Sequence, residues 1–206
     1  MEEHFRTMSM KTLNAIDFLI DYINLPVSSL TPEQFPIIIK TSSDVLINPS
    51  QLMKMVEYLR NLKMYEFLAG MQGQNILFER FHDDKHFMPE YIIPGKGVKG
   101  LLHGATYLLS YSAAKQILDY SKCLPAIPYL DDIVLTGILR ERLGFATIKM
   151  NQCWLISTEE VLDSALNGRN ASKYRNIAIY HNEPAINREQ YKLLWHYLNK
   201  NSLINF

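Results

Sequence analysis

Apolar side chains recur three or four residues apart in several segments, which is the spacing of a helix with one buried face. We expect helices over residues 5–24, from Asn48-Pro49-Ser50 onward, over 112–120, after Asp131-Asp132, and over 187–198. Pro49 suits the first turn of its helix, and Gly144 is a natural residue to follow the end of the fourth. Residues 61–100 show no clear period apart from short apolar pieces within 75–81.

Short runs of consecutive apolar residues alternate with these helices. Residues 37–40, 105–110, 146–150 and 177–180 are predicted strands. Strands that alternate with helices favour an α/β fold. The first of these strands leads into Ser42, Ser43 and Asp44, and the last leads into His181. Because α/β folds place their chemistry at the carboxyl ends of strands, these side chains are candidate site residues.

Composition narrows the class of protein. The chain has 206 residues, enough for one domain or two very small ones. Its 21 basic residues balance its 21 acidic residues without a basic run, so we expect no nucleic-acid partner. No apolar stretch reaches the roughly 20 residues that cross a bilayer, and residues 1–11 lack the apolar core of a signal peptide. Cys123 and Cys153 are compatible with a disulfide or with two free thiols.

Each ionisable candidate also has a purely structural explanation. Acidic residues such as Asp131 and Asp132 often open a helix, where they cap free N–H groups and favour the positive end of the helix dipole. Asp44 is typical of a turn. A lone histidine after a strand, such as His181, is usually structural. Taken one at a time, these residues therefore do not identify a function.

Taken in order, several segments resemble the beta-1,3-galactosyltransferase-like family (glycosyltransferase family 31, which includes N-acetylglucosaminyl and fringe-like enzymes). Residues 3–12 resemble the family segment DSYxNLTxKT, and KTSSDVLIN, residues 40–48, resembles KxDDDxFVN. HGATYLLS, residues 103–110, is similar to SGxGYVLS, and LDDIVLTGILRERLG, residues 130–144, is similar to LEDVxxGxxxxxLG. Weaker likenesses occur at Arg80, Lys85, Ile93-Pro94 and from His181 to Trp195.

The resemblance implies a fold and a reaction. We expect one GT-A-like domain over residues 1–206, with a mixed sheet and flanking helices, that lacks the first strand–helix unit of the family. The implied reaction moves galactose or N-acetylglucosamine from a UDP-sugar to a glycan hydroxyl on protein or lipid, in beta-1,3 linkage with inversion. The resemblance also implies the Golgi apparatus as the compartment. The family has a membrane anchor, which we expect only in a full-length form of this chain.

The resemblance also assigns roles to residues. Asp132 takes the position of the catalytic base, and Asp131 takes the position of the family's glutamate. Lys40, Ser42, Ser43 and Asp44 fall in the donor-binding segment. Mn²⁺, a hard ion that accepts carboxylate and imidazole, would lie between Asp44 and His181.

Two hypotheses therefore stand side by side. The first is an inverting UDP-sugar-dependent hexosyltransferase, favoured by the joint presence of Asp44, Asp132 and His181. The second is a catalytically inactive family member or fragment that binds a glycan or a protein. Ser42 and Ser43 favour it, because they replace two carboxylates and a hydroxyl brings no charge to a metal.

Overall fold

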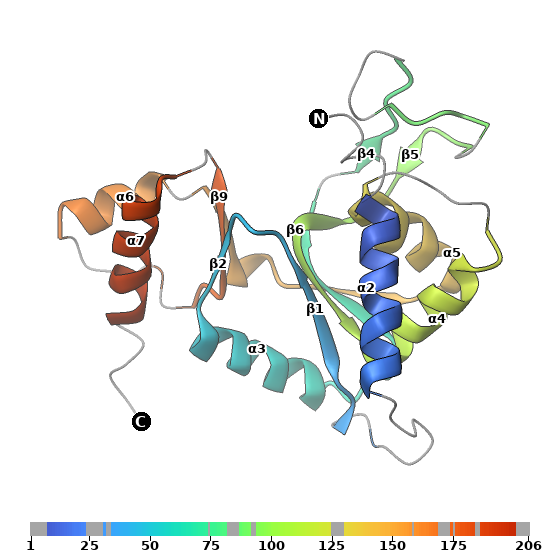
Figure 1. Cartoon of the computed structure of the whole chain (residues 1–206), viewed down its shortest axis with the longest axis horizontal. Coiled ribbons are helices and arrows are strands. Elements are labelled where there is room, and N and C mark those ends of the chain that lie inside the picture. Colours follow the sequence, from blue (N-terminus) through green and yellow to red (C-terminus); the bar gives the residue numbers. More distant parts are fainter. Residues whose placement is uncertain are drawn as a thin grey trace. The chain divides into compact units, whose positions relative to one another are not determined.

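The computed structural model describes residues 8–23, 31, 34–73, 75–81, 87–91, 94–124, 130–157, 159–168, 174, 176–183 and 186–200. The chain divides into two compact units. Unit 1 consists of Met1–Lys40 and Lys63–Lys149, and unit 2 of Thr41–Leu62 and Met150–Phe206. Within the described ranges, no helix is both long and apolar enough to cross a membrane. Figure 1 shows the elements of both units and labels many of them.

Unit 1 is built on a four-stranded sheet in the order β1-β6-β3-β7. These strands are β1 (Ile37–Thr41, whose last residue passes into unit 2), β6 (Leu102–Ser110), β3 (Phe67–Gln72) and β7 (Ala146–Lys149). β3 runs antiparallel to β6 and parallel to β7, so the sheet is mixed. A separate antiparallel ribbon pairs β4 (Ile76–Leu77) with β5 (Gly97–Val98).

Helices pack on this sheet through one apolar core. They are α2 (Met8–Ile23), α4 (Tyr111–Ser121), the π-helix η3 (Asp132–Leu139) and its short continuation α5 (Arg140–Leu143). The core joins Leu13 and Ile16 of α2 to Leu68 of β3, Ile117 of α4 and Leu135 of η3. Gly144 ends α5 in the left-handed conformation, with φ of 71°, a geometry that favours glycine.

Unit 2 contains a three-stranded sheet in the order β2-β9-β8. Its elements are β2 (Val45–Ile47), α3 (Pro49–Asn61), η4 (Asn151–Cys153), β8 (Trp154–Ser157), α6 (Glu159–Leu166), β9 (Ile179–Glu183) and α7 (Arg188–Lys200). β9 is antiparallel to β2 and parallel to β8. The Asn48 side chain caps α3 by accepting a hydrogen bond from the Gln51 N–H. Leu46, Tyr180 and Leu194 are among the residues of the apolar core of unit 2.

The mixed α/β fold confirms the prediction from the sequence, and the predicted helices and strands are present with small shifts at their ends. Three details add to this picture. The N-cap of α4 is Ser110, not Ser112, because strand β6 runs directly into the helix. Trp195 is 39% exposed and lies outside the apolar core of unit 2. Both cysteines are free thiols. Residues 3–7, Lys85 and Ile93, which contribute to the family likeness, lie outside the described residues.

Candidate active site

Asp131 is a buried carboxylate with three partners from three different elements. Its Oδ2 atom accepts hydrogen bonds from the Tyr107 hydroxyl at 2.8 Å and the Thr12 hydroxyl at 3.2 Å. The same oxygen pairs with Lys40 Nζ at 3.1 Å, and the Asp131 side chain is only 2% exposed. Burial raises the pKa of Tyr107 well above its usual range, and the Asp131 charge adds to this rise, so the phenol stays a donor. Asp131 makes no side-chain capping hydrogen bond, so the capping explanation does not account for it.

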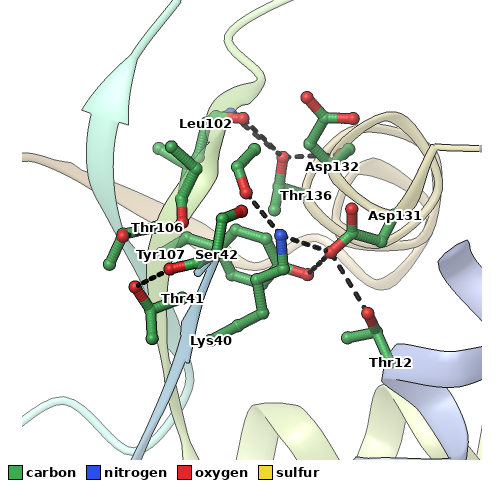
Figure 2. A network of polar contacts seen from close by, with 12 residues as sticks. Thr12, Lys40, Thr41, Ser42, Leu102, Thr106, Tyr107, Asp131, Asp132 and Thr136 are labelled. Atoms are coloured by element: carbon green, nitrogen blue, oxygen red, sulfur yellow. Dashed lines mark hydrogen bonds and ion pairs between the residues drawn. The ribbon is translucent and has the colours of Figure 1, made fainter. Parts of the chain in front are cut away.

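Asp132, the first residue of η3, points the other way. Figure 2 shows Asp131 turned toward Lys40 and Tyr107, whereas Asp132 points away from that cluster. Its Oδ1 atom accepts a hydrogen bond from the Ile133 N–H at 2.8 Å, which satisfies one free donor at the start of the helix. Burial raises the pKa of Asp132 from 3.8 to about 6, and the Asp131 charge adds to the rise. The Ile133 N–H and Lys40 oppose it. A carboxyl group with this pKa suits a general base near neutral pH.

Two contacts fix η3 against strand β6. The Thr136 hydroxyl accepts a hydrogen bond from the Leu102 N–H at 3.0 Å and donates to the Asp132 carbonyl at 2.7 Å. Gly104 lies directly against the Asp132 side chain, and a Cβ at this position would be 2.7 Å from Asp132 Oδ2. A larger residue at position 104 would therefore force the Asp132 side chain to shift. Strand β6 thus sets the position of the Asp132 carboxylate from two sides.

A pocket of about 470 Å³ opens beside this carboxylate. Asp132 and Gly104 form part of its wall, together with the polar residues Glu79 and His103. Apolar residues complete the lining: Ile76, Leu77, Phe78, Met88, Ala105, Leu130 and Ile133. Leu77 is 77% exposed, so part of the apolar lining is open to solvent. The arrangement can hold a small polar molecule that presents a hydroxyl to Asp132.

Asp44 and His181 come together within unit 2. Asp44 lies in the turn before β2, and the antiparallel register pairs Val45 with His181 of β9. The Asp44 Oδ2 and His181 Nε2 atoms are 3.2 Å apart, and the two side chains are 51% and 10% exposed. Ser42 and Ser43 precede Asp44 on the same short connection.

The chemistry of this pair fits two ligands of a divalent metal ion. The two atoms lie within hydrogen-bond distance of each other, and a carboxylate oxygen together with an imidazole nitrogen is a set of donors that a divalent ion such as Mn²⁺ would accept. The described part of the chain contains no group of three or more His, Cys, Asp and Glu side chains that could hold a metal ion. The pair would therefore need oxygen ligands from a bound molecule or from water to complete a site.

The structure thus brings together two sets of predicted residues. Lys40, Asp131 and Asp132 lie together in unit 1, and Asp44 and His181 lie together in unit 2. Sequence reasoning did not single out Thr12, Gly104 or Thr136 as neighbours of the carboxylates. One signal was present: Lys40 follows the apolar run Ile37-Ile38-Ile39, and a lysine next to a buried strand needs a counter-charge.

Comparison with known proteins adds one match. A family model described as galactosyltransferase matches residues 1–151, about three quarters of the chain. The match includes all of unit 1 and Asp44, whereas His181 lies beyond it. Curated proteins give no match.

Proposed function

This chain belongs to the galactosyltransferase family, and on that basis we propose that it is an inverting glycosyltransferase whose base is Asp132. The donor in this proposal is UDP-galactose or UDP-N-acetylglucosamine, and the acceptor is a glycan hydroxyl that becomes beta-1,3 linked. The Golgi lumen is the compartment that we propose for the reaction. One observation carries the proposal: Asp132 is a carboxylate of raised basicity on the wall of an open pocket.

Asp132 supplies the step that inversion needs. Its carboxylate takes the proton of the acceptor hydroxyl while that oxygen forms a bond to the anomeric carbon of the donor sugar. The bond from that carbon to the diphosphate breaks on the opposite face, and the electron pair leaves with UDP. With a pKa of about 6, Asp132 is a stronger base than an ordinary aspartate and is still mostly ionised at pH 7. Gly104 and Thr136 hold the helix start in place, which limits motion of the base.

The pocket beside Asp132 is the proposed acceptor site. Glu79 and His103 supply hydrogen-bonding groups that orient sugar hydroxyls. Leu77, Met88 and the other apolar side chains suit the C–H face of a sugar ring or an apolar group attached to it. Orientation of one hydroxyl toward Asp132 would then select the linkage.

Asp44 and His181 are the proposed protein ligands of Mn²⁺. When bound, the ion supplies positive charge that stabilises the departing diphosphate. Asp44 contributes a charged oxygen and His181 a ring nitrogen, and the hydroxyls of Ser42 and Ser43 are positioned in sequence to hydrogen-bond the donor. Because only one carboxylate remains in this segment, we expect weak metal binding in the absence of UDP.

A second candidate function is a non-catalytic module that binds a glycan or a protein. The observation that favours it is that serines stand at positions 42 and 43, where the family has carboxylates. In addition, the described residues offer no group of three or more side chains that could hold a metal ion. Such a module would keep the pocket beside Asp132 and would not bind UDP.

Calorimetric titration with UDP, with and without Mn²⁺, separates the two functions. The transferase predicts UDP binding that requires Mn²⁺, followed by transfer to an acceptor that Asp132→Asn abolishes while UDP binding remains. Absence of UDP binding by a folded chain would contradict the transferase and favour the module. Equal loss of UDP binding and transfer in Asp132→Asn would contradict the role of Asp132 as base.

A further inference from the structure

Lys40 is held inside unit 1 by two groups that are neighbours of Asp132. Its Nζ atom pairs with Asp131 Oδ2 at 3.1 Å and donates to the Gly104 carbonyl, and it lies 5.4 Å from the centre of the Tyr107 ring. The Lys40 side chain is 15% exposed. Figure 2 shows the ammonium group turned into this cluster, with dashed lines to its partners. The positive charge of Lys40 is therefore paired with groups of the protein itself.

The two polar partners of Lys40 are the groups that position Asp132. Asp131 immediately precedes Asp132 at the start of η3, and Gly104 of β6 packs against the Asp132 carboxylate. Lys40, from β1, therefore ties the start of the helix to the strand on which the Asp132 carboxylate rests.

We infer that Lys40 is a positioning residue, which holds the start of η3 against β6 and balances the Asp131 charge beside Asp132, and that it does not bind the sugar donor. This inference rests on the proposed role of Asp132 as base. It revises the role that the family likeness assigned to Lys40, because the lysine side chain is directed to Asp131 and the Gly104 carbonyl.

The positive charge of Lys40 lowers the pKa of Asp132. The charged and titratable groups around Asp132, from its own helix and from the elements packed against it, are Asp131, Lys40, Tyr107, Glu79 and His103. Asp131 repels a second negative charge, whereas Lys40 stabilises it. Without Lys40, the Asp131 charge would no longer be opposed by a nearby cation, so the Asp132 carboxyl would take up its proton at higher pH.

The test replaces Lys40 with methionine, which matches the unbranched stem of lysine up to its last carbon and removes the charged ammonium group. The matched control is Lys122→Met, at an exposed lysine that follows α4. Carbon-13 NMR of the side-chain carboxyl groups follows the proton uptake of Asp132 directly and needs no substrate. In Lys40→Met we expect Asp132 to take up its proton about one pH unit higher than in the unsubstituted chain, with no shift in the control. Lys40→Arg keeps the charge and should titrate close to the unsubstituted chain.

UDP titration in the presence of Mn²⁺ supplies the opposing readout. Unchanged UDP affinity in Lys40→Met together with the shifted titration supports the inference. Weakened UDP binding with an unshifted carboxylate titration overturns it and returns Lys40 to the donor site. Because the NMR titration is independent of transfer, failure of the proposed function would appear separately, as absent UDP binding or absent transfer in the unsubstituted chain.

A second variant keeps the inference testable if Lys40→Met does not fold. Lys40→Met combined with Asp131→Asn removes both buried charges and leaves no unpaired one. Since the Asp131 effect on Asp132 is larger than the Lys40 effect, we expect the double variant to titrate Asp132 at or below the pH of the unsubstituted chain. An upward shift in the double variant would overturn the proposed charge balance.

Discussion

Replacement of Asp132 by asparagine is expected to stabilise the fold while it removes activity. Burial and the Asp131 charge raise the pKa of Asp132 from 3.8 to about 6. This rise corresponds to roughly 3 kcal/mol, because each pKa unit is about 1.4 kcal/mol of differential interaction. The folded state binds the proton more tightly than the unfolded chain does. The contribution of Asp132 to stability is therefore complete below pH 3.8 and is lost as pH rises through about 6.

At pH 7.5 the unsubstituted protein must keep a charged carboxylate in a partly buried place, and Asp132→Asn does not. The introduced asparagine side chain can still accept the hydrogen bond of the Ile133 N–H through its amide oxygen. We expect Asp132→Asn to be more stable by about 2–3 kcal/mol at pH 7.5. At pH 4.5 the difference should fall to about 1 kcal/mol, since Asp132 is then mostly protonated in the folded state.

Denaturant unfolding at the two pH values measures this difference. Asp119→Asn is the matched control, because Asp119 is an exposed carboxylate of α4, and its substitution should change stability by less than about 0.5 kcal/mol. The reasoning is refuted if Asp132→Asn destabilises the protein at pH 7.5, or if its effect is the same at both pH values. The same pKa predicts that the transfer rate falls about tenfold per pH unit below pH 6.

Three further substitutions test the geometry. Gly104→Ala places a Cβ 2.7 Å from Asp132 Oδ2, so it should lower the free energy of unfolding by about 1–3 kcal/mol. It should also lower kcat while UDP binding is retained. An unchanged kcat would show that the close contact is unimportant for transfer. Asn48→Ala removes the cap of α3 and should cost about 1 kcal/mol in denaturant unfolding, with most of it recovered by Asn48→Ser. His181→Ala should weaken the Mn²⁺ dependence of UDP binding, measured by calorimetry, and an unaltered Mn²⁺ titration would exclude this histidine from the metal site.

The sequence predicted those elements whose signals are local. The helical period over residues 8–23, the Asn48-Pro49 start of α3 and the glycine after α5 each depend on neighbours in sequence. Strands β2 and β3 were missed for physical reasons. β2 has only three residues, and β3 (Phe67–Gln72) begins with four buried residues, Phe67-Leu68-Ala69-Gly70, that show no alternation between buried and exposed faces.

The site was predictable only as a set of separate residues. The family likeness selected Lys40, Asp131 and Asp132, but it did not indicate that Lys40 and Asp131 form an ion pair. Thr12 reaches Asp131 across 119 positions of sequence, and no local pattern encodes such a contact. The pKa of Asp132 depends on burial and on the neighbouring charge, which exist only after β6 and η3 have packed.

Strand β2 can pair with β9 only late in translation, because the two strands lie far apart in the sequence. Asp44 and His181 are separated by 137 positions, so on the ribosome Asp44 is made long before its partner. At about 5–20 residues per second, the nascent chain waits roughly 7–27 s before His181 is added. Throughout this interval the β2 edge has no β9 to pair with, and such an edge is open to association with other chains. Translation speed over residues 45–181, and chaperone binding during that interval, should therefore affect the yield of folded protein.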